Sequence, residues 1–307
     1  MAKTTGRRPV RIAARAAAAA LTAALVATGT SAVAADAPQP TLGAAENQPA
    51  AAPASAAASV PVPYFSLYAV NSAGLAYAYG PNGKGGLTAR VQRGENWFGV
   101  SAMMQVDHRD AEGVDGESDG LWFRENNGDM GYLKFDSSAV KIGYGWDIYK
   151  KIVSPGQIGG AAAGDMLAVD SKGDLYVYLG YGDGKVTKRI KAGYGWNIYT
   201  QIAGNGDLNG DGKNDIVARD KAGVLWLYKG TGNQKAPFAK RTRIGSGWNQ
   251  YDTLVSTGDI TLDGKTDLLA RKGGELYLYQ GTGNATAPYK SKKLVGTSGW
   301  NSYKFLF

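Results

Sequence analysis

Two acidic loops in the second half of the chain carry the side chains best suited to chemistry. The first has a D-x-N-x-D-G-x-x-D pattern, in which Asp207, Asn209 and Asp211 occupy positions one, three and five. Oxygen-bearing side chains at this spacing can converge on one hard cation. A backbone carbonyl near Lys213 can add a ligand, and Asp215 can complete the shell. The alternative is a solvated turn rich in Asp and Asn.

The second acidic loop repeats this pattern with one weaker donor. Its equivalent positions are Asp259, Thr261, Asp263, Lys265 and Asp267, so a hydroxyl replaces the amide oxygen of the first loop. We therefore expect weaker binding there. Ligation by oxygen alone, in a chain without cysteine, favours Ca²⁺ over zinc or copper.

Two further stretches align with these loops less well. One contains an insertion and offers Asp107, Asp110, Asp115 and Asp119; the sequence leaves open whether it binds calcium. The other has Gln157, Gly159, Ala161 and Asp165 at the equivalent positions. Because most of its carboxylates are lost, we expect that loop to bind no metal.

A repeated aromatic motif identifies the elements that hold these loops. The pattern Gly-Trp-x-x-Tyr occurs four times, with tryptophans at 146, 196, 248 and 300, and a degenerate copy lies at Trp97. The intervals of 49 to 52 residues are those of propeller blades.

Each repeat unit reads as four short strands. In the fourth unit they are residues 199–203, 215–219, 224–228 and 239–244, which are β-branched and aromatic runs separated by Gly, Asn and Asp. The first unit starts at its second strand, 66–70, and the last ends with a first strand, 302–307. We therefore predict an all-β, five-bladed β-propeller closed by the C-terminal strand, against an open or dimer-completed array.

The N-terminal fifth of the chain has a different composition. Residues 1–35 combine five basic residues, an Ala/Leu/Val run and a small-residue site at Ala32 to Ala35, which is typical of a secretory signal peptide. Arg7-Arg8 leaves twin-arginine export as the alternative route. Residues 36–63, rich in Ala and Pro, are expected to form a flexible tether, followed by the propeller over 64–307. The predicted mature protein is secreted and extracellular, with no membrane span.

Charge argues against a nucleic-acid partner. The chain has 34 Lys and Arg against 26 Asp and Glu, but five of the basic residues and none of the acidic ones lie in residues 1–35. Removal of the signal peptide therefore removes most of the basic excess.

The acidic loop, the following Asp-Ile-Val-Ala-Arg-Asp run, the Leu-Trp-Leu-Tyr strand and the Gly-Thr-Gly bend resemble the FG-GAP or VCBS repeats of integrin-α-type β-propellers, especially those secreted by actinomycetes. The resemblance covers residues 64–307 and implies calcium held by the two acidic loops. Five units depart from the common seven-bladed form. A five-bladed ring with Gly-Trp-x-x-Tyr repeats is also similar to tachylectin-type lectins, which bind sugars between blades.

Binding is better supported than catalysis. His108 is the only histidine, and we interpret it as a surface residue of an acidic loop; a hydrolase using it is a minor alternative. Trp and Tyr suit stacking on sugars or anchoring at protein interfaces, although the tryptophans can equally be packing residues. The candidate ligand contacts are Tyr144, Trp146, Tyr194, Trp196, Trp248 and Trp300.

The sequence thus predicts a calcium-stabilised, lectin-like module that binds glycans or cell-surface components, alone or as the targeting subunit of a larger secreted assembly. A scaffold that binds a secreted protein partner is the alternative.

Overall fold

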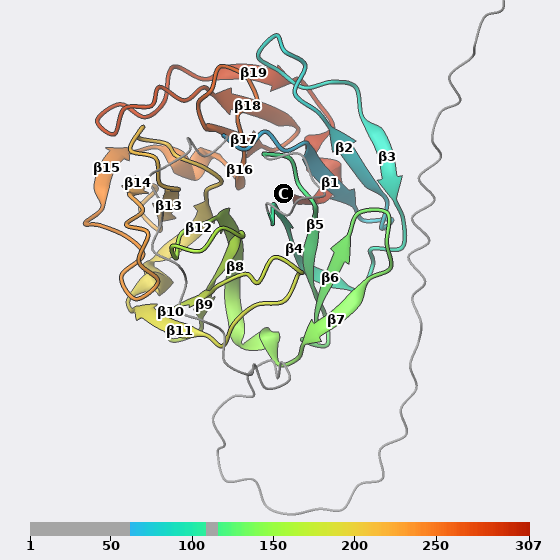
Figure 1. Cartoon of the computed structure of the whole chain (residues 1–307). Coiled ribbons are helices and arrows are strands. Elements are labelled where there is room, and N and C mark those ends of the chain that lie inside the picture. Colours follow the sequence, from blue (N-terminus) through green and yellow to red (C-terminus); the bar gives the residue numbers. More distant parts are fainter. Residues whose placement is uncertain (1–61, 109–115) are drawn as a thin grey trace, which may run out of the picture.

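The protein forms a ring of five antiparallel sheets around a central channel (Figure 1). The computed structural model describes residues 62–108 and 116–307. The predicted signal peptide and most of the predicted tether therefore lie outside the described residues. Each sheet has four strands, with the first near the channel and the fourth at the rim. The predicted all-β, five-bladed fold is confirmed.

The blades follow one another in chain order. Blade 1 contains β20 (Tyr303–Leu306), β1 (Leu67–Asn71), β2 (Ala76–Tyr79) and β3 (Val91–Gly94). Blade 2 contains β4 (Val100–Val106), β5 (Gly120–Glu125), β6 (Met130–Lys134) and β7 (Val140–Gly143). Blade 3 contains β8 (Tyr149–Gly156), β9 (Asp165–Asp170), β10 (Leu175–Tyr178) and β11 (Ile190–Gly193). Blade 4 contains β12 (Tyr199–Ala203), β13 (Ile216–Asp220), β14 (Leu225–Tyr228) and β15 (Thr242–Gly245). Blade 5 contains β16 (Thr253–Gly258), β17 (Asp267–Lys272), β18 (Glu275–Tyr279) and β19 (Lys293–Gly296).

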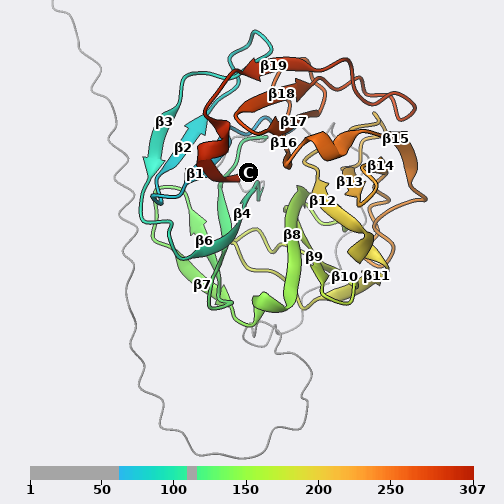
Figure 2. The same cartoon turned by 180° about the vertical axis from the view of Figure 1, so that it is seen from behind.

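The last strand closes the ring. In Figure 2, β20 lies beside β1, and the two pair antiparallel with Ala69 opposite Leu306 and Val70 opposite Phe305. This pairing removes an unpaired edge from the inner side of blade 1. The closure predicted from the two incomplete repeat units is therefore confirmed.

Burial falls from the inner strands to the rim. The second strands are almost wholly buried because both of their faces pack against neighbouring blades, whereas the fourth strands are largely exposed. The fourth strands are also shorter than predicted. In blade 4, β15 starts at Thr242 rather than at residue 239, because a bridge between Gly230 and Phe238 keeps the preceding residues in a loop.

Four short 3-10 helices occur where the sequence predicted none. They are η1 (Trp146–Ile148), η2 (Trp196–Ile198), η3 (Trp248–Gln250) and η4 (Trp300–Ser302). Each follows a glycine with φ between 74° and 84°, a conformation that side chains with a Cβ rarely adopt. The glycine of each Gly-Trp-x-x-Tyr motif thus turns the chain from one blade into the next.

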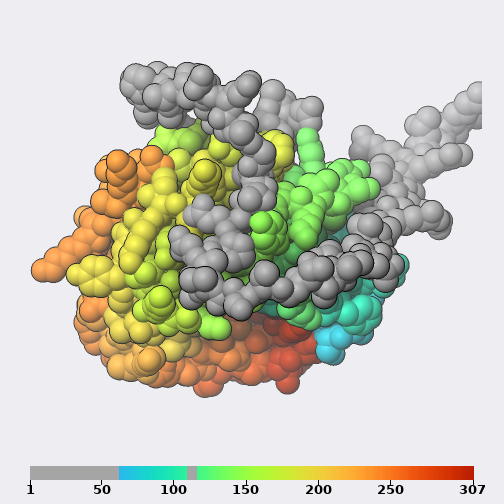
Figure 3. All heavy atoms as spheres, turned by 90° about the horizontal axis from the view of Figure 1, so that it is seen from below, coloured from blue at the N-terminus to red at the C-terminus, as the bar shows by residue number. Residues whose placement is uncertain are grey.

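The two faces of the ring differ in their connections. The loops from first to second strands and from third to fourth strands share one face, here called the loop face. The 3-10 helices and the turns between second and third strands share the other, here called the turn face. Figure 3 views the ring from its edge, between these two faces.

The described part of the ring begins with the last two residues of the predicted tether. Pro63 accepts a hydrogen bond from the backbone N–H of Asp259, and Phe65 donates its own to Thr257, both in blade 5. Tyr64 donates to the carbonyl of Gly116 in blade 2. This segment therefore joins two blades across the loop face. Among the described residues, no helix is long and apolar enough to cross a bilayer.

Candidate functional site

The last aspartate of each acidic loop anchors the loop to its blade. In blade 4 the carboxylate of Asp215 accepts hydrogen bonds from the backbone N–H of Leu208 and of Gly230, at 3.0 and 2.8 Å. In blade 5, Asp267 accepts from Thr261 and Gly281 in the same way, at 2.9 and 2.7 Å. Both aspartates thus tie the first loop of a blade to its third-to-fourth-strand loop.

The other predicted ligands of blade 4 lie around the first loop position. Asp207 accepts backbone hydrogen bonds from Asn209, Gly210 and Gly212, so its carboxylate lies at the centre of the loop. The side-chain amide of Asn209 donates to Asp215 at 2.7 Å, and Asp211 is exposed. The structure therefore brings Asp207, Asn209 and Asp215 together, with Asp211 at the solvent side. Lys213 is also exposed. Its predicted contribution is the backbone carbonyl and not the side chain.

Blade 5 has the same arrangement. Asp259 accepts backbone hydrogen bonds from Asp263 and Gly264, and the Thr261 hydroxyl contacts it at 3.4 Å. Lys265 is half-buried at the equivalent of Lys213. All the predicted donors of this loop thus lie in the loop that leads from β16 into β17.

The pKa values of the two anchoring carboxylates are raised, and a bound cation would lower them. Burial raises the pKa of Asp215 and of Asp267 to about 6, against hydrogen bonds that lower it. The neighbouring charge of Asp207 adds to the rise for Asp215, and those of Asp259 and Asp263 add to it for Asp267. The donors are all oxygens, which fits Ca²⁺. In the described residues, no three acidic or histidine side chains are gathered in an arrangement that could hold a metal ion.

Blade 3 keeps the anchor without the predicted ligands. Asp165 accepts backbone hydrogen bonds from Ile158, Gly159 and Gly180, at 2.9, 2.7 and 3.1 Å. A Cβ at Gly159 would lie 2.1 Å from the Cδ2 atom of Leu179. The leucine thus fills the space that the side chains of Asn209 and Thr261 take in the next two blades.

The interrupted loop of blade 2 is described only at its ends. Asp110 and Asp115 lie outside the described residues. Asp107 accepts a hydrogen bond from the backbone N–H of Gly116 at 3.2 Å, and Asp119 accepts one from that of His108 at 2.5 Å.

The interpretation of His108 as a surface residue is wrong. Its side chain is only 4% exposed and packs edge-on against Trp122 and Tyr132, with ring centroids 5.6 and 5.2 Å away. These two aromatic side chains, from β5 and β6, explain the burial. A buried histidine among aromatic rings is poorly placed to reach a substrate, which weakens the hydrolase alternative.

The four motif tryptophans are buried between blades. Each lies 4.6 to 4.8 Å, centroid to centroid, from a third-strand tyrosine; the pairs are Trp146 with Tyr178, Trp196 with Tyr228, Trp248 with Tyr279 and Trp300 with Tyr79. The tyrosine of each motif donates or accepts a hydroxyl hydrogen bond with the same third-strand tyrosine. None of the four tryptophans is more than 7% exposed. This burial favours packing over ligand contact.

The two motif-flanking tyrosines are exposed on the turn face. Tyr194 is 85% exposed and Tyr144 is 40% exposed. Tyr194 precedes η2 at the junction of blades 3 and 4, and Tyr144 precedes η1 at the junction of blades 2 and 3. Of the six candidate ligand contacts, these two alone have a ring that a ligand can reach.

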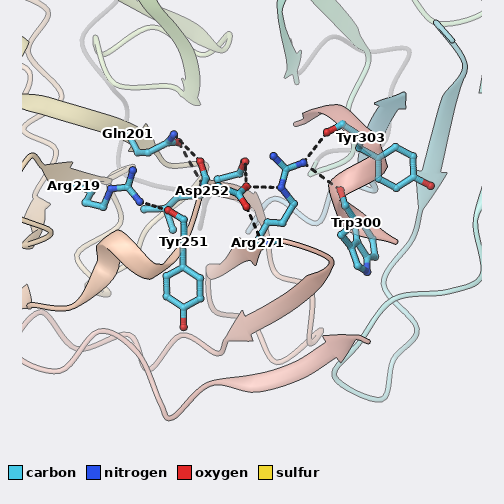
Figure 4. Close-up of polar contacts among 10 residues, drawn as sticks. Gln201, Arg219, Tyr251, Asp252, Arg271, Trp300 and Tyr303 are labelled. Carbon is cyan, nitrogen blue, oxygen red and sulfur yellow. Dashed lines mark hydrogen bonds and ion pairs between the residues drawn. The ribbon is translucent and has the colours of Figure 1, made fainter. Parts of the chain in front are cut away.

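A set of arginine clamps was not predicted as functional or structural. Arg219 of β13 donates to the carbonyls of Trp248 and Tyr251, which lie at the start of the next blade. The bond to Tyr251 is drawn in Figure 4. Arg271 donates to the carbonyls of Trp300 and Tyr303, at 3.2 and 2.7 Å. Arg124 makes the same bonds to Trp146 and Tyr149. Each clamp thus fixes the following 3-10 turn to the blade before it.

The remaining two junctions have valine in place of the arginine. At the junction of blades 1 and 2, Val70 replaces it and Lys304 of β20 donates to the carbonyl of Val100 at 2.9 Å. At the junction of blades 3 and 4, Val169 replaces it, and within the described part of the chain no side chain donates to the carbonyls of Trp196 or Tyr199. The signal in the sequence is an arginine near the end of the second strand, which follows alanine in blades 4 and 5 and Phe123 in blade 2.

The innermost strands of all five blades enclose a cavity of about 160 Å³ in the channel. Phe65, Met103, Leu254 and Phe307 are among the residues that line it. This volume is below the several hundred Å³ of a usual small-molecule site. Ligand contacts are therefore better sought on the outside of the ring.

These five sheets with a closing last strand define a five-bladed β-propeller. Residues 207–270, which include both acidic loops, match the family model described as an FG-GAP-like repeat. The resemblance to FG-GAP repeats is thereby confirmed for this part of the chain. No curated protein sequence matches the chain.

Comparison with solved structures gives matches at low identity and with TM-scores below 0.5. The BP39L lectin of Burkholderia pseudomallei is 14% identical with a TM-score of 0.45, over 73% of this chain and 66% of the lectin. The Aleuria aurantia lectin is 14% identical with a TM-score of 0.42, over 77% and 79%. Regucalcin, a calcium-binding protein of Agrobacterium tumefaciens, is 12% identical with a TM-score of 0.38, over 76% and 74%. Likeness at this level says nothing of what this chain binds.

Proposed function

We propose that this propeller is a secreted binding module that recognises glycans or cell-surface components through the blade junctions of its turn face. The observation that carries the proposal is the 85% exposure of Tyr194, which stands beside a buried Trp-Tyr-Tyr cluster. An exposed aromatic ring next to a packed junction suits stacking on a sugar ring.

Repetition supports the same proposal. Tyr144 holds the equivalent place at the preceding junction, so two aromatic contacts are presented by one rigid ring. Weak sites on a common scaffold gain avidity for a polymer or a cell surface. The module can act alone or as the targeting subunit of a secreted assembly. A protein-binding scaffold is the second candidate, since Phe98 on the same face is 61% exposed and exposed aromatics also anchor protein partners.

A glycan array with the mature protein tests the proposal. We expect binding to a restricted set of glycans, and a loss of at least about tenfold in affinity for Tyr144→Ser with Tyr194→Ser, since each stacking contact contributes about 1 kcal/mol or more. Lys172→Ser and Lys221→Ser, two exposed substitutions in turns of the same face, serve as the matched control. An array without hits, together with a partner that the double tyrosine variant no longer captures, would favour the scaffold.

We also propose that the loops of blades 4 and 5 bind calcium and that this stabilises the ring. The all-oxygen donor sets and the mutual repulsion of their carboxylates support it. A chelator should lower the melting temperature of the wild type and leave that of Asp211→Ala with Asp263→Ala unchanged. Both substituted residues are exposed, so the variant keeps the buried anchors Asp215 and Asp267. A wild-type melt that ignores chelator would sink this proposal.

A further inference from the structure

The rim of the ring is strongly basic. Of the 29 basic residues after residue 35, 14 lie in four segments, 84–94, 185–193, 235–245 and 290–296. None of the 26 acidic residues lies in them. These segments lead into and include the outermost strands β3, β11, β15 and β19 of four blades (Figure 1). The near-neutral net charge of the predicted mature chain thus conceals a separation of charge between the rim and the rest of the ring.

Protection of an edge strand explains only part of this pattern. Charged side chains keep exposed edges from pairing with other sheets, and lysine is common there. Acidic side chains would also serve that purpose, yet these segments contain none. Charge of a single sign instead raises the local concentration of anionic ligands and speeds their association.

The rim cations recur at one position, where each lies over an aromatic ring. The residue just before the fourth strand stacks on the second residue of the third strand or its equivalent. The cation-to-centroid distances are 4.7 Å for Arg90 over Tyr77, 4.8 Å for Arg189 over Tyr176, 4.1 Å for Arg241 over Trp226 and 4.5 Å for Lys292 over Tyr277. We call these four cation–aromatic pairs the rim notches.

Hydrogen bonds hold the three arginines of the rim notches in place. Arg90 donates to the hydroxyl of Tyr303 at 3.2 Å, Arg189 donates to that of Tyr149 at 3.3 Å, and Arg241 donates to that of Tyr199. A guanidinium has five N–H donors in a planar fork that matches a carboxylate or sulfate. An arginine already oriented by a ring and a hydroxyl loses less side-chain freedom when it binds such a group.

We infer that the rim notches bind an anionic polysaccharide, one that carries carboxylate or sulfate groups. This inference rests on the proposed glycan-binding function: it names the ligand class and adds the rim to the turn-face tyrosines as a contact surface. The oxyanions pair with the cations of the rim notches, while neighbouring lysines such as Lys188, Lys240 and Lys290 add long-range attraction.

The shape of the ring favours a flexible polymer over other anionic partners. The rim notches belong to strands that face outward on different sides of the ring (Figure 1). A flat membrane cannot touch all of them at once. Duplex DNA is stiff over about 150 base pairs, so it does not wrap around a single small domain without a large bending cost.

The test uses heparin as the sulfated probe and polygalacturonate as the carboxylated probe, with the full mature protein. The rim-notch variant is Arg90→Gln, Arg189→Gln, Arg241→Gln and Lys292→Gln. The matched control removes four exposed lysines from outside the rim by Lys150→Gln, Lys172→Gln, Lys221→Gln and Lys272→Gln. We expect the rim-notch variant to lose about 100-fold in affinity and to show a shallower salt dependence, and the control to lose less than about threefold.

A second variant keeps the test valid if loss of the arginines disturbs packing. It replaces the exposed Arg93, Lys188, Lys240 and Lys290 by Gln, leaving every rim notch intact. We expect an intermediate loss of about tenfold with an unchanged melting temperature, because these cations contribute only long-range attraction. Equal losses of affinity in the rim-notch variant and the control variant would overturn the inference, since binding would then follow net charge alone.

The other probes separate the possible failures. Duplex DNA or anionic vesicles that bind as tightly as heparin, with the same sensitivity to the rim-notch variant, would replace the polysaccharide with another ligand class. If neutral glycans bind on the array while neither anionic probe does, the inference fails and the proposed function stands. If no glycan of either kind binds, both fail.

Discussion

Blades 3 and 4 have the same strand pairings but different polar chemistry. In both, the last loop aspartate accepts three or more hydrogen bonds, and a buried tryptophan stacks on a third-strand tyrosine. Blade 4 adds the Arg219 clamp and the carboxylates Asp207 and Asp211. Blade 3 has Val169, Gln157 and Ala161 at those positions.

The comparison separates what the fold requires from what individual blades add. The polar and aromatic features that blades 3 and 4 share are the buried aspartate and the Trp-Tyr-Tyr cluster, in addition to their strand pairings and buried second strands. The clamp, the acidic loop and the exposed Tyr194 are additional features that differ from blade to blade. Four substitutions test this division.

The largest effect is expected from Arg219→Met. The arginine is 7% exposed and donates to two backbone carbonyls of blade 5 and to Thr200. Its loss removes the side-chain donor to both carbonyls and leaves that of Trp248 with only the backbone N–H of Tyr251. We expect the free energy of unfolding to fall by about 3 to 4 kcal/mol, measured by denaturant titration. Lys221→Met, two residues away and exposed, is the control. A loss below about 1 kcal/mol would mean that blade 4, like blade 3 with Val169, is stable with an apolar side chain at this position.

The anchor Asp165 should produce a pH-dependent difference. Burial raises its pKa in the folded state to about 6 from the ordinary aspartate value of 3.8, so the folded state holds the proton more tightly than the unfolded state does. Its contribution to stability is therefore greatest below pH 4 and falls as the pH rises to 6. The unfolding free energy of the wild type relative to Asp165→Asn should fall by up to about 3 kcal/mol between pH 4 and pH 7.

The same measurement has an internal control. Asp183→Asn should change in the opposite direction, because the hydrogen bonds and charge of Lys185 outweigh burial and lower the pKa of Asp183. The Asp165 difference should also be insensitive to calcium. A calcium-dependent shift at Asp165 would show that the loop of blade 3 binds metal after all.

Gly159→Asn tests whether Leu179 sterically excludes a ligand side chain from the loop of blade 3. The new Cβ would meet Leu179, so we expect a loss of about 2 kcal/mol from overpacking. Adding Leu179→Ala should restore part of that stability, which a double-mutant cycle by thermal melting would detect. Two losses that simply add would show that the leucine does not exclude a ligand side chain from this loop.

The smallest effect on stability is expected from Tyr194→Ser, which copies Ser246 of the next junction. Because the ring is 85% exposed, the change in unfolding free energy should stay within about 0.5 kcal/mol. Affinity for a glycan identified on the array should nevertheless fall, and the reverse substitution Ser246→Tyr should raise it. A large loss of stability would reassign Tyr194 to packing.

The sequence predicted the ring because its signals are periodic. The repeated Gly-Trp-x-x-Tyr motif and the two incomplete end units led directly to five blades and to the pairing of β20 with β1. The positions of the acidic loops were also predicted correctly, since a loop between two strands of one hairpin is a local feature.

Contacts between blades were not predictable in the same way. Arg219 reaches carbonyls about 30 residues further along, and nothing in its own strand indicates that target. The burial of His108 depends on Trp122 and Tyr132 from two other strands. Leu179, which follows the third strand of blade 3, occupies the space beside Gly159. Such effects depend on distances that sequence patterns do not contain.

Closure of the ring has a kinetic consequence. The hydroxyls of Tyr79 and Tyr303 meet 2.5 Å apart although 224 residues separate them in the chain. Blades 2 to 5 are built from neighbouring residues, whereas blade 1 cannot be completed until the last strand arrives. Because contacts of long sequence separation form slowly, we expect blade 1 to be the last blade to gain protection from hydrogen exchange during refolding, and the first to lose it when the protein opens.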